Sequence, residues 1–375
     1  MRRQEDAVLS EDVLIEILSW LPVTTLVGFK CVSKSWNSLI SDPHFQKLHI
    51  QRSSVDSTNL RLLLENKFDQ DQGGFSNTTS LSSWSVTRLL GNPSPIPLIR
   101  PSFTQHYSVI GSCNGLIALH AESPPLVYPY KTLVYFWNPA TREISPESPS
   151  YDSSTKFNNF GFGYDHTSDA YKVVVLFPGK VHSMGANCWT DIQTLPDDQY
   201  QVHMYGVYLS DTLNWIALRK SGDYVKMFVI VSLHLGKESY AELPLPDPLQ
   251  DHDPCIWHLP ILCVSRGCLC VSCYHMDTHF VIWQMKELGL KKSWTCLVNI
   301  NLEYVETCYP GIEFLSFTMC LFQNGDVLLL ATQAYTQFCS VLFNQRDGIL
   351  KVVEIPSVLS VYNAWNYVES LVSPI

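Results

Sequence analysis

The first fifty residues carry apolar positions at helical spacing. Apolar side chains recur there three and four positions apart, as they do along one face of a helix. This set consists of Val13, Leu14, Ile17, Leu18 and Leu21. The Ser10 hydroxyl can cap free backbone N–H groups ahead of the set, and Pro22 cannot continue a helix. The pattern therefore predicts a first helix between Ser10 and Pro22.

Further short helices are expected up to residue 50. The apolar residues that would face inward from them are Leu26, Phe29, Cys31, Val32, Trp36, Leu39 and Ile40. Asp42 followed by Pro43 is typical of a helix start, so we expect a last helix through His49. Three or four helices in about forty residues bury little apolar surface by themselves. From the pattern alone, a helical cap on a larger domain is the favoured interpretation.

Beyond residue 100 the pattern changes to short apolar runs separated by turn residues, without helical periodicity. The runs repeat in five units that begin at Gly111, Phe160, Tyr205, Leu262 and Phe317. Each unit has a hairpin around Gly or Asn and then further short strands, and the starts lie about 45 to 57 residues apart. Units of about 40–50 residues with four strands are typical of β-propeller blades.

A closed ring of blades requires a first blade that the five units do not supply. The run 60–68 predicts a strand or short helix, the polar segment 69–83 predicts a loop, and 84–90 is a second apolar run. Joined to the C-terminal segment, residues 60–90 would complete about six blades, which leaves only short sheet edges exposed. A two-sheet sandwich is the alternative. The chain thus predicts an α+β multidomain protein, with a small all-α domain at 5–50, a linker at 51–59 and an all-β domain at 60–375.

Composition and charge limit the classes of function. Only 16% of the residues are charged, against roughly 25% in an average globular protein, and 12% are aromatic, which suits many short strands. The formal net charge is −10, so the chain lacks the basic surface that binds phosphate backbones. We therefore expect no nucleic acid among its partners.

The chain shows no targeting or membrane-spanning signal. Two arginines near the start are followed by acidic residues rather than by an apolar run, and no stretch approaches the ~18–20 apolar residues of a spanning helix. We expect a cytoplasmic or nuclear protein that does not insert into membranes. In those compartments its twelve cysteines should be reduced thiols.

One group of cysteines and histidines resembles a metal site. Its members are Cys263, Cys268, Cys270, Cys273, His275 and His279. The spacing from Cys270 to Cys273 suits zinc, but alternation along a strand puts Cys268 and Cys270 on one face and Cys273 on the other. Packing in the core is therefore favoured over metal binding. No glycine-rich phosphate loop or nucleophile elbow occurs either, so we expect no cofactor and no enzymatic activity.

Partner contacts in such a chain are expected on loops. The segments 128–130, 191–199 and 247–257 are the polar or proline-flanked candidates, because binding residues concentrate on loops held by a rigid frame. Trp137, Trp189 and Trp215 instead are expected to pack one blade against the next.

The particular residues of the N-terminal helices reverse the first interpretation. Residues 9–23 (LSEDVLIEILSWLPV), 29–36 and 39–45 together closely resemble the plant F-box motif, with Ser10 where that family usually has proline. The resemblance implies a trihelical module that binds the Skp adaptor of a cullin-based ubiquitin ligase. The positions it carries over as adaptor contacts or module core are Leu9, Val13, Ile17, Leu18, Leu21, Pro22, Leu26, Cys31, Val32 and Trp36. Leu21 would be the natural hot spot among them.

The repeat region resembles the plant F-box-associated interaction domain. The similar segments are 113–117, 137–142, 160–165, 213–215 and 367–374. That family is related to kelch-like propellers and is taken to present substrates. The resemblance implies a non-catalytic substrate-recognition subunit of an SCF-type ligase, which binds the Skp adaptor, cullin through it, and an unknown target protein. An adaptor-bound scaffold or decoy is the alternative, and a propeller enzyme with a copper site a more distant one.

Overall fold

A computed structural model of the chain describes most of its length. The described residues are 10–53, 59–68, 78–86, 96–97, 107–122, 130–153, 159–195, 199–221, 225–250, 259–276, 278–321, 325–333, 337–354 and 361–375.

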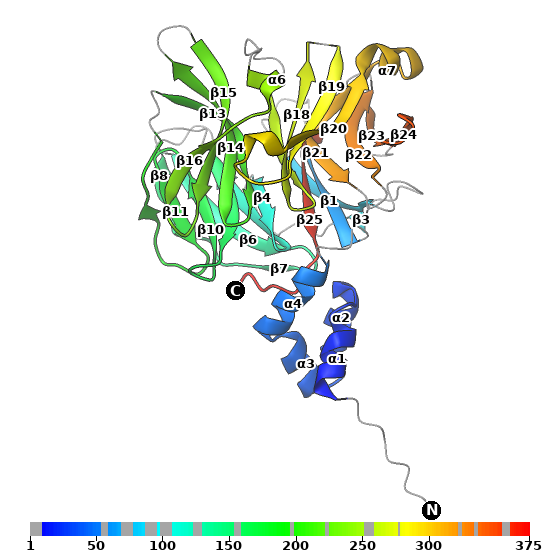
Figure 1. Cartoon of the computed structure of the whole chain (residues 1–375). Coiled ribbons are helices and arrows are strands. Elements are labelled where there is room, and N and C mark those ends of the chain that lie inside the picture. Colours follow the sequence, from blue (N-terminus) through cyan, green and yellow to red (C-terminus); the bar gives the residue numbers. More distant parts are fainter. Residues whose placement is uncertain are drawn as a thin grey trace, which may run out of the picture.

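Four helices form the N-terminal module, as predicted (Figure 1). They are α1 (Glu11–Leu18), α2 (Val23–Phe29), α3 (Lys34–Ile40) and α4 (Pro43–Ser53). Side-chain oxygens cap three of them: Ser10 and Ser33 accept hydrogen bonds from backbone N–H groups of α1 and α3, and Asp42 Oδ1 accepts from two N–H groups of α4 at 2.8 and 3.2 Å. Helix α4 runs to Ser53, beyond His49 and into the expected linker, because Arg52 in its last turn binds Glu16 of α1 at 2.6 Å.

The described strands after the module form six blades of four strands each, with one extra strand beside the second blade. The third and fourth blades are joined into one eight-stranded sheet by a single parallel pair, Gly161 with Gly206. Blade 1 consists of β1 (Leu60–Phe68), β2 (Thr78–Ser85), β3 (Ile96–Pro97) and β25 (Val361–Val368). Blade 2 consists of β4 (Tyr107–Cys113), β5 (Leu116–Glu122), β6 (Tyr130–Asn138) and β7 (Glu143–Ile144), with β8 (Tyr151–Ser153) paired to β6. Blade 3 consists of β9 (Phe160–Asp165), β10 (Ala170–Val175), β11 (Lys180–Ser183) and β12 (Thr190–Asp191).

Blades 4 to 6 continue the same antiparallel order. Blade 4 consists of β13 (Tyr200–Leu209), β14 (Thr212–Ser221), β15 (Val225–His234) and β16 (Ser239–Leu243). Blade 5 consists of β17 (Ile261–Ser265), β18 (Cys268–His275), β19 (His279–Met285) and β20 (Trp294–Asn301). Blade 6 consists of β21 (Ile312–Leu321), β22 (Val327–Gln333), β23 (Gln337–Phe343) and β24 (Leu350–Glu354). Short helices α6 (Asp247–Gln250), η2 (Lys291–Ser293) and α7 (Leu302–Cys308) lie in connections.

The six blades close into a ring through the C-terminal strand. The innermost strands β25, β4, β9, β13, β17 and β21 contact one another in that circular order. Strand β25 pairs with β1 from Leu60–Val368 to Asn66–Val361, so the two ends of the domain share one sheet. Closure by the C-terminal segment and a ring of six blades are thereby confirmed, and the sandwich alternative is wrong.

One strand falls where a loop was expected. Strand β2 begins at Thr78, inside the polar segment 69–83, and pairs with β1 over its whole length. A strand rich in hydroxyls is possible there because its inward groups find partners: buried Ser83 hydrogen-bonds Tyr367 OH at 2.8 Å. Residues 69–77 and 87–90 of the two expected segments lie outside the described residues.

The apolar cores lie between consecutive blades. Trp215 is fully buried where blades 3 and 4 meet, and Trp137 is buried between blades 1 and 2. Trp189 packs between blades 2 and 3, and its Nε1 donates to the Pro149 carbonyl at 2.6 Å. The predicted packing role of these tryptophans is confirmed. Gly206 is needed beside Trp215, since a Cβ at that position would come within 2.4 Å of the indole ring.

The module lies against one face of the ring (Figure 1). Ala140, in the turn between β6 and β7, packs on the module core, and Asp169, between β9 and β10, pairs with Lys47 of α4 at 2.7 Å. Because neighbouring strands of a blade are antiparallel, the connections between its first and second and its third and fourth strands share this face. The other connections, including α6 and α7, lie on the opposite face.

Candidate functional site

The helical module has a small apolar core. Its buried members are Leu18, Val23, Leu26, Ile40 and Phe45, joined by Leu371 from the C-terminus. Leu18 and Leu26, both among the adaptor-binding positions implied by resemblance, are only 1% and 0% exposed. The sequence left open whether these residues contact the adaptor or form the module core, and their burial puts them in the core.

A row of large apolar side chains on α1 and the turn after it faces outward. Val13, Ile17 and Trp20 are 44%, 49% and 63% exposed. Positions four and three residues apart lie on the same side of a helix, so the three side chains form one continuous surface, the α1 stripe. Exposed apolar surface of this kind marks sites of protein interaction.

The remaining implied positions differ in exposure. Pro22, Cys31 and Val32 are exposed, and Val32 is 61% accessible. Leu21 and Trp36 are partly buried against the core, and the Trp36 ring meets Phe29 edge-on at 5.2 Å. Leu21, expected as a hot spot, is therefore less accessible than Ile17. Leu9 lies outside the described residues.

Trp20 was not singled out from the sequence, although it is the most exposed member of the stripe. Its Nε1 donates to Glu16 Oε1 at 3.2 Å, and the Arg52 guanidinium lies 4.9 Å from its ring centre. The Arg52 hydrogen bond, and then that of Trp20, lowers the pKa of Glu16. An aromatic side chain held in place before binding loses little freedom when a partner covers it. In the sequence, the signal that could have identified Trp20 was its position three residues after Ile17.

The C-terminal tail, residues 369–375, joins the module to the ring (Figure 1). Leu371 is 1% exposed within the module core, and the Asn138 amide of blade 2 donates to the carbonyls of Ser370 and Val372 at 3.0 and 2.7 Å. Glu369 pairs with Arg61 at 2.8 Å. Burial raises the pKa of Glu369, and the Arg61 charge offsets part of that rise. The tail thus contacts both domains at once.

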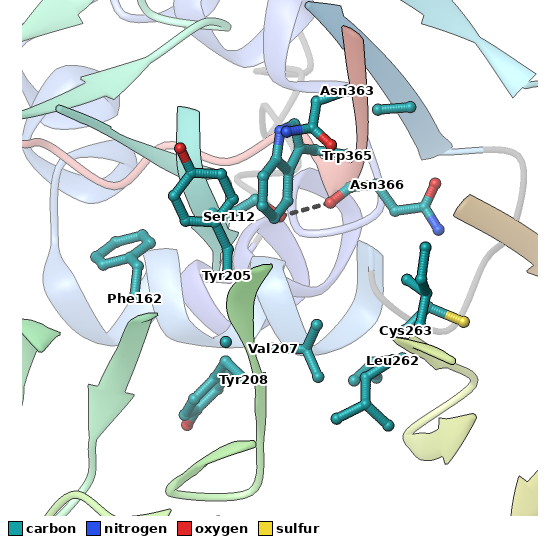
Figure 2. Close-up of a pocket in the computed structure, with 15 residues that line it drawn as sticks. Ser112, Phe162, Tyr205, Val207, Tyr208, Leu262, Cys263, Asn363, Trp365 and Asn366 are labelled. Carbon is teal, nitrogen blue, oxygen red and sulfur yellow. Dashed lines mark hydrogen bonds between the residues drawn. The ribbon is translucent and has the colours of Figure 1, made fainter. Parts of the chain in front are cut away.

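A central cavity of about 130 Å³ lies between the innermost strands. Figure 2 shows Asn363 and Trp365 of β25 on one side of it, with Val207 and Leu262 on the opposite side. Tyr205 lies 5.6 Å from Trp365, ring centre to ring centre. All the lining residues are uncharged.

A second cavity, of about 200 Å³, lies between the central cavity and the helical module. It shares Ser112, Tyr208 and Asn366 with the central cavity, and Ile50 of α4 and Leu60 line its other side. The helical module therefore borders this end of the axial space through Ile50.

Three cysteines of blade 5 pack as apolar residues, whereas Cys268 is half-buried. Cys263 and Cys270 are cross-strand neighbours, both buried between blades 5 and 6, whereas Cys273 is buried between blades 4 and 5. Burial raises the pKa of the Cys273 thiol to about 12. Across the described ranges no three His, Cys, Asp or Glu residues are grouped to hold a metal ion.

The described ends of the three loops expected to bind partners lie on one face of the ring. Segments 191–199 and 247–257 lead from one blade to the next, and 128–130 leads into the third strand of blade 2. Connections of these two kinds lie on the face opposite the helical module. Residues 128–129, 196–198 and 251–258 lie outside the described residues.

Comparisons with known proteins find a matching family for the helical module and for the ring. The F-box associated beta propeller domain matches residues 92–367, and the F-box domain matches residues 8–48. An F-box/kelch-repeat protein of Arabidopsis thaliana is 27% identical, with 97% of this chain and 95% of that protein covered. The F-box protein CPR1 of the same plant is also 27% identical, over 79% of this chain and 73% of its own length.

A solved structure supports the fold alone. TolB from Acinetobacter baumannii superposes with a TM-score of 0.50 at 8% identity, covering 87% of this chain and 73% of TolB. In the part of the chain that the structure describes, every helix is too short or too polar to cross a membrane.

Proposed function

Because this chain belongs to the F-box proteins that carry an F-box associated beta propeller domain, we propose that it is the substrate-recognition subunit of an SCF-type cullin ubiquitin ligase. The helical module would bind the Skp adaptor, and cullin through it. The face of the ring opposite the module would hold a target protein. The observation that carries this proposal is the α1 stripe, which is an exposed apolar surface on a module whose core is already filled.

The stripe has the properties of a protein-binding surface. Interfaces depend on a few large anchors near their centre, and tryptophan is among the most frequent. Trp20 is fixed by Glu16 and Arg52 before any partner binds, and Ile17 lies beside it. We place the energetic centre of the adaptor interface on Ile17 and Trp20, with Val13 at its edge.

The contribution of the chain to ubiquitin transfer would be proximity. A target held on the ring has a high local concentration at the ligase-bound conjugating enzyme, so the receptor needs no reacting group of its own. Fixing the module to the ring through the C-terminal tail would keep the distance between adaptor and target within a narrow range. This role would place the protein in the cytoplasm or the nucleus.

Binding of the purified chain to a purified plant Skp adaptor tests the proposal. Ile17→Asp buries a charge without a partner at the centre of the interface, and we expect it to weaken binding by about 30-fold or more. Met276→Asp is the matched control, because Met276 is 68% exposed in the β18–β19 connection on the opposite face. Unchanged affinity of the Ile17→Asp variant would contradict the assigned interface.

A further inference from the structure

Exposed apolar side chains on the face opposite the module gather at one place. Among the described residues of that face, the widely exposed large apolar side chains are Met276 and Tyr304, at 68% and 51%. Met276 lies in the β18–β19 turn, and Tyr304 lies in the first turn of α7 (Figure 1). The two elements are joined where the Leu302 N–H donates to the Thr278 carbonyl at 2.9 Å. Both side chains therefore belong to one part of this face, on blades 5 and 6.

Helix α7 holds Tyr304 in a fixed position. Asn301 Oδ1 accepts a hydrogen bond from the Tyr304 N–H at 3.0 Å, and Val305 is only 2% exposed in the core between blades 5 and 6. After the helix, Tyr309 OH donates to the Leu350 carbonyl at 3.1 Å. Tyrosine is enriched at protein interfaces, and a residue on a fixed backbone loses little freedom on binding. Tyr304 therefore has the properties of an interface anchor.

The chain around α7 carries acidic residues without basic ones. The sequence from Trp294 to Gln345 contains no Lys, Arg or His. Glu303 and Glu306 on α7 and Glu313 on β21 are all exposed. Partners are selected by complementary charge, so this part of the face favours a basic polypeptide.

A groove of about 340 Å³ opens beside the β18–β19 turn. His275 and His279, at the two ends of that turn, line the groove together with Trp283 of β19 and Pro248 of α6. Pockets of about 300–1,000 Å³ hold drug-sized ligands, so this groove has room for one large apolar side chain.

We propose that the α7 surface, formed by Met276, Glu303, Tyr304, Glu306 and Glu313, binds a segment of the target protein that carries lysine or arginine next to a large apolar side chain. The three glutamates pair with the basic side chains, and the Tyr304 ring accepts one of these cations on its face. The apolar side chain enters the groove beside the β18–β19 turn. This inference rests on the proposed role of the ring as the target-binding part of the receptor.

A phage-displayed library of short random peptides is the probe, selected on the immobilised full chain in low salt. We expect the selected peptides to contain more Lys and Arg than Asp and Glu, together with leucine or an aromatic residue. One selected peptide is then labelled, and its affinity is measured by fluorescence anisotropy. Because salt screens exposed charges, this affinity should fall about tenfold between about 50 and about 500 mM NaCl.

Two double substitutions test whether the charge acts at this surface. Glu303→Gln with Glu306→Gln should weaken peptide binding about fivefold in low salt. Glu238→Gln with Glu287→Gln is the matched control, because both glutamates are exposed in connections on the module face and the same net charge is removed. Equal weakening by both double variants would show attraction to the net charge of the chain and would overturn the proposal.

Tyr304→Lys tests the anchor. It removes the ring and repels a basic segment, so we expect peptide binding to weaken by about tenfold or more. Leu288→Lys is the matched control, since Leu288 is 43% exposed in the β19–β20 connection on the module face. Full peptide affinity in Tyr304→Lys, or a selection without an excess of basic residues, would contradict the assigned surface.

Adaptor binding by the same variants separates this inference from the proposed function. Tyr304→Lys should keep the adaptor and lose the peptide, whereas Ile17→Asp should keep the peptide and lose the adaptor. A native chain that binds the adaptor but selects no basic peptide would overturn this inference alone. A chain that binds the peptide but not the adaptor would support the α7 surface and overturn the role of the module.

Discussion

The helical module and the propeller differ in how they cover their apolar side chains. In the propeller, each cluster between blades is closed by residues of two neighbouring sheets, as where Trp215 fills the space between blades 3 and 4. The module buries only a handful of its own apolar residues and completes its core with Leu371 from the far end of the chain. It also leaves Ile17 and Trp20 exposed.

This difference follows from size. A ring of six blades gives every blade two apolar neighbours, whereas about forty residues of helix cannot enclose all of their apolar surface. On one side of the module, the tail of the same chain covers apolar surface that the helices cannot enclose. The other side, the α1 stripe, remains open, and we propose the adaptor for it. Exposed apolar surface thus concentrates where the smaller domain requires a partner.

The dependence of the module on the tail can be tested at Leu371. Leu371→Ala should destabilise the module by about 2–5 kcal/mol, the range for truncating a fully buried leucine. The loss should appear as faster hydrogen exchange in α1 to α4, with little change in blades 4 and 5. Ile375→Ala is the control, because Ile375 is 82% exposed at the end of the same tail. Unchanged exchange in the helices would show that the module core is complete without Leu371.

A smaller effect is expected on acidification. Burial lowers the pKa of His49 in α4, and the hydrogen bond that its Nε2 donates to the Leu21 carbonyl at 2.9 Å offsets part of that shift. The folded module therefore favours neutral His49, while the unfolded chain takes up a proton as pH falls through about 6.5. Stability contributed by His49 is present above that pH and is lost below it.

Hydrogen exchange of α1 to α4 at pH 7.5 and 5.5 measures this loss, and His49→Gln should reduce its pH dependence. The propeller should also lose stability as pH falls below about 6.5, because burial lowers the pKa of its His120 to about 4, but His49→Gln should leave that response unchanged. Equal pH dependence in the native and His49→Gln chains would exclude His49 as the cause.

Features set by nearby residues were predictable from the sequence. The spacing of Val13 and Ile17 and the cap at Asp42 are local signals, and they predicted α1 and the start of α4. The regular recurrence of strand runs predicted the blades and their number. Strand β2 was missed because its hydroxyls are favourable only once partners such as Tyr367 surround them.

Features built from distant residues could not be predicted. Leu371 joins the module core only after the ring has closed, and the Trp20 side chain is held by Arg52 from another helix. The central cavity takes its lining from several strands that are far apart in the sequence. Such contacts depend on the fold as a whole, so no pattern in one segment indicates them.

Affinity capture from plant cells with ligase activity blocked tests most directly whether the module binds the adaptor while the ring binds the target. Native chain and the Ile17→Asp variant are compared as baits, with the recovered proteins quantified by mass spectrometry. The account predicts that Ile17→Asp loses the Skp adaptor and cullin but retains the other proteins that the native chain captures. Recovery of adaptor by both baits, or loss of every captured protein together with the adaptor, would contradict it.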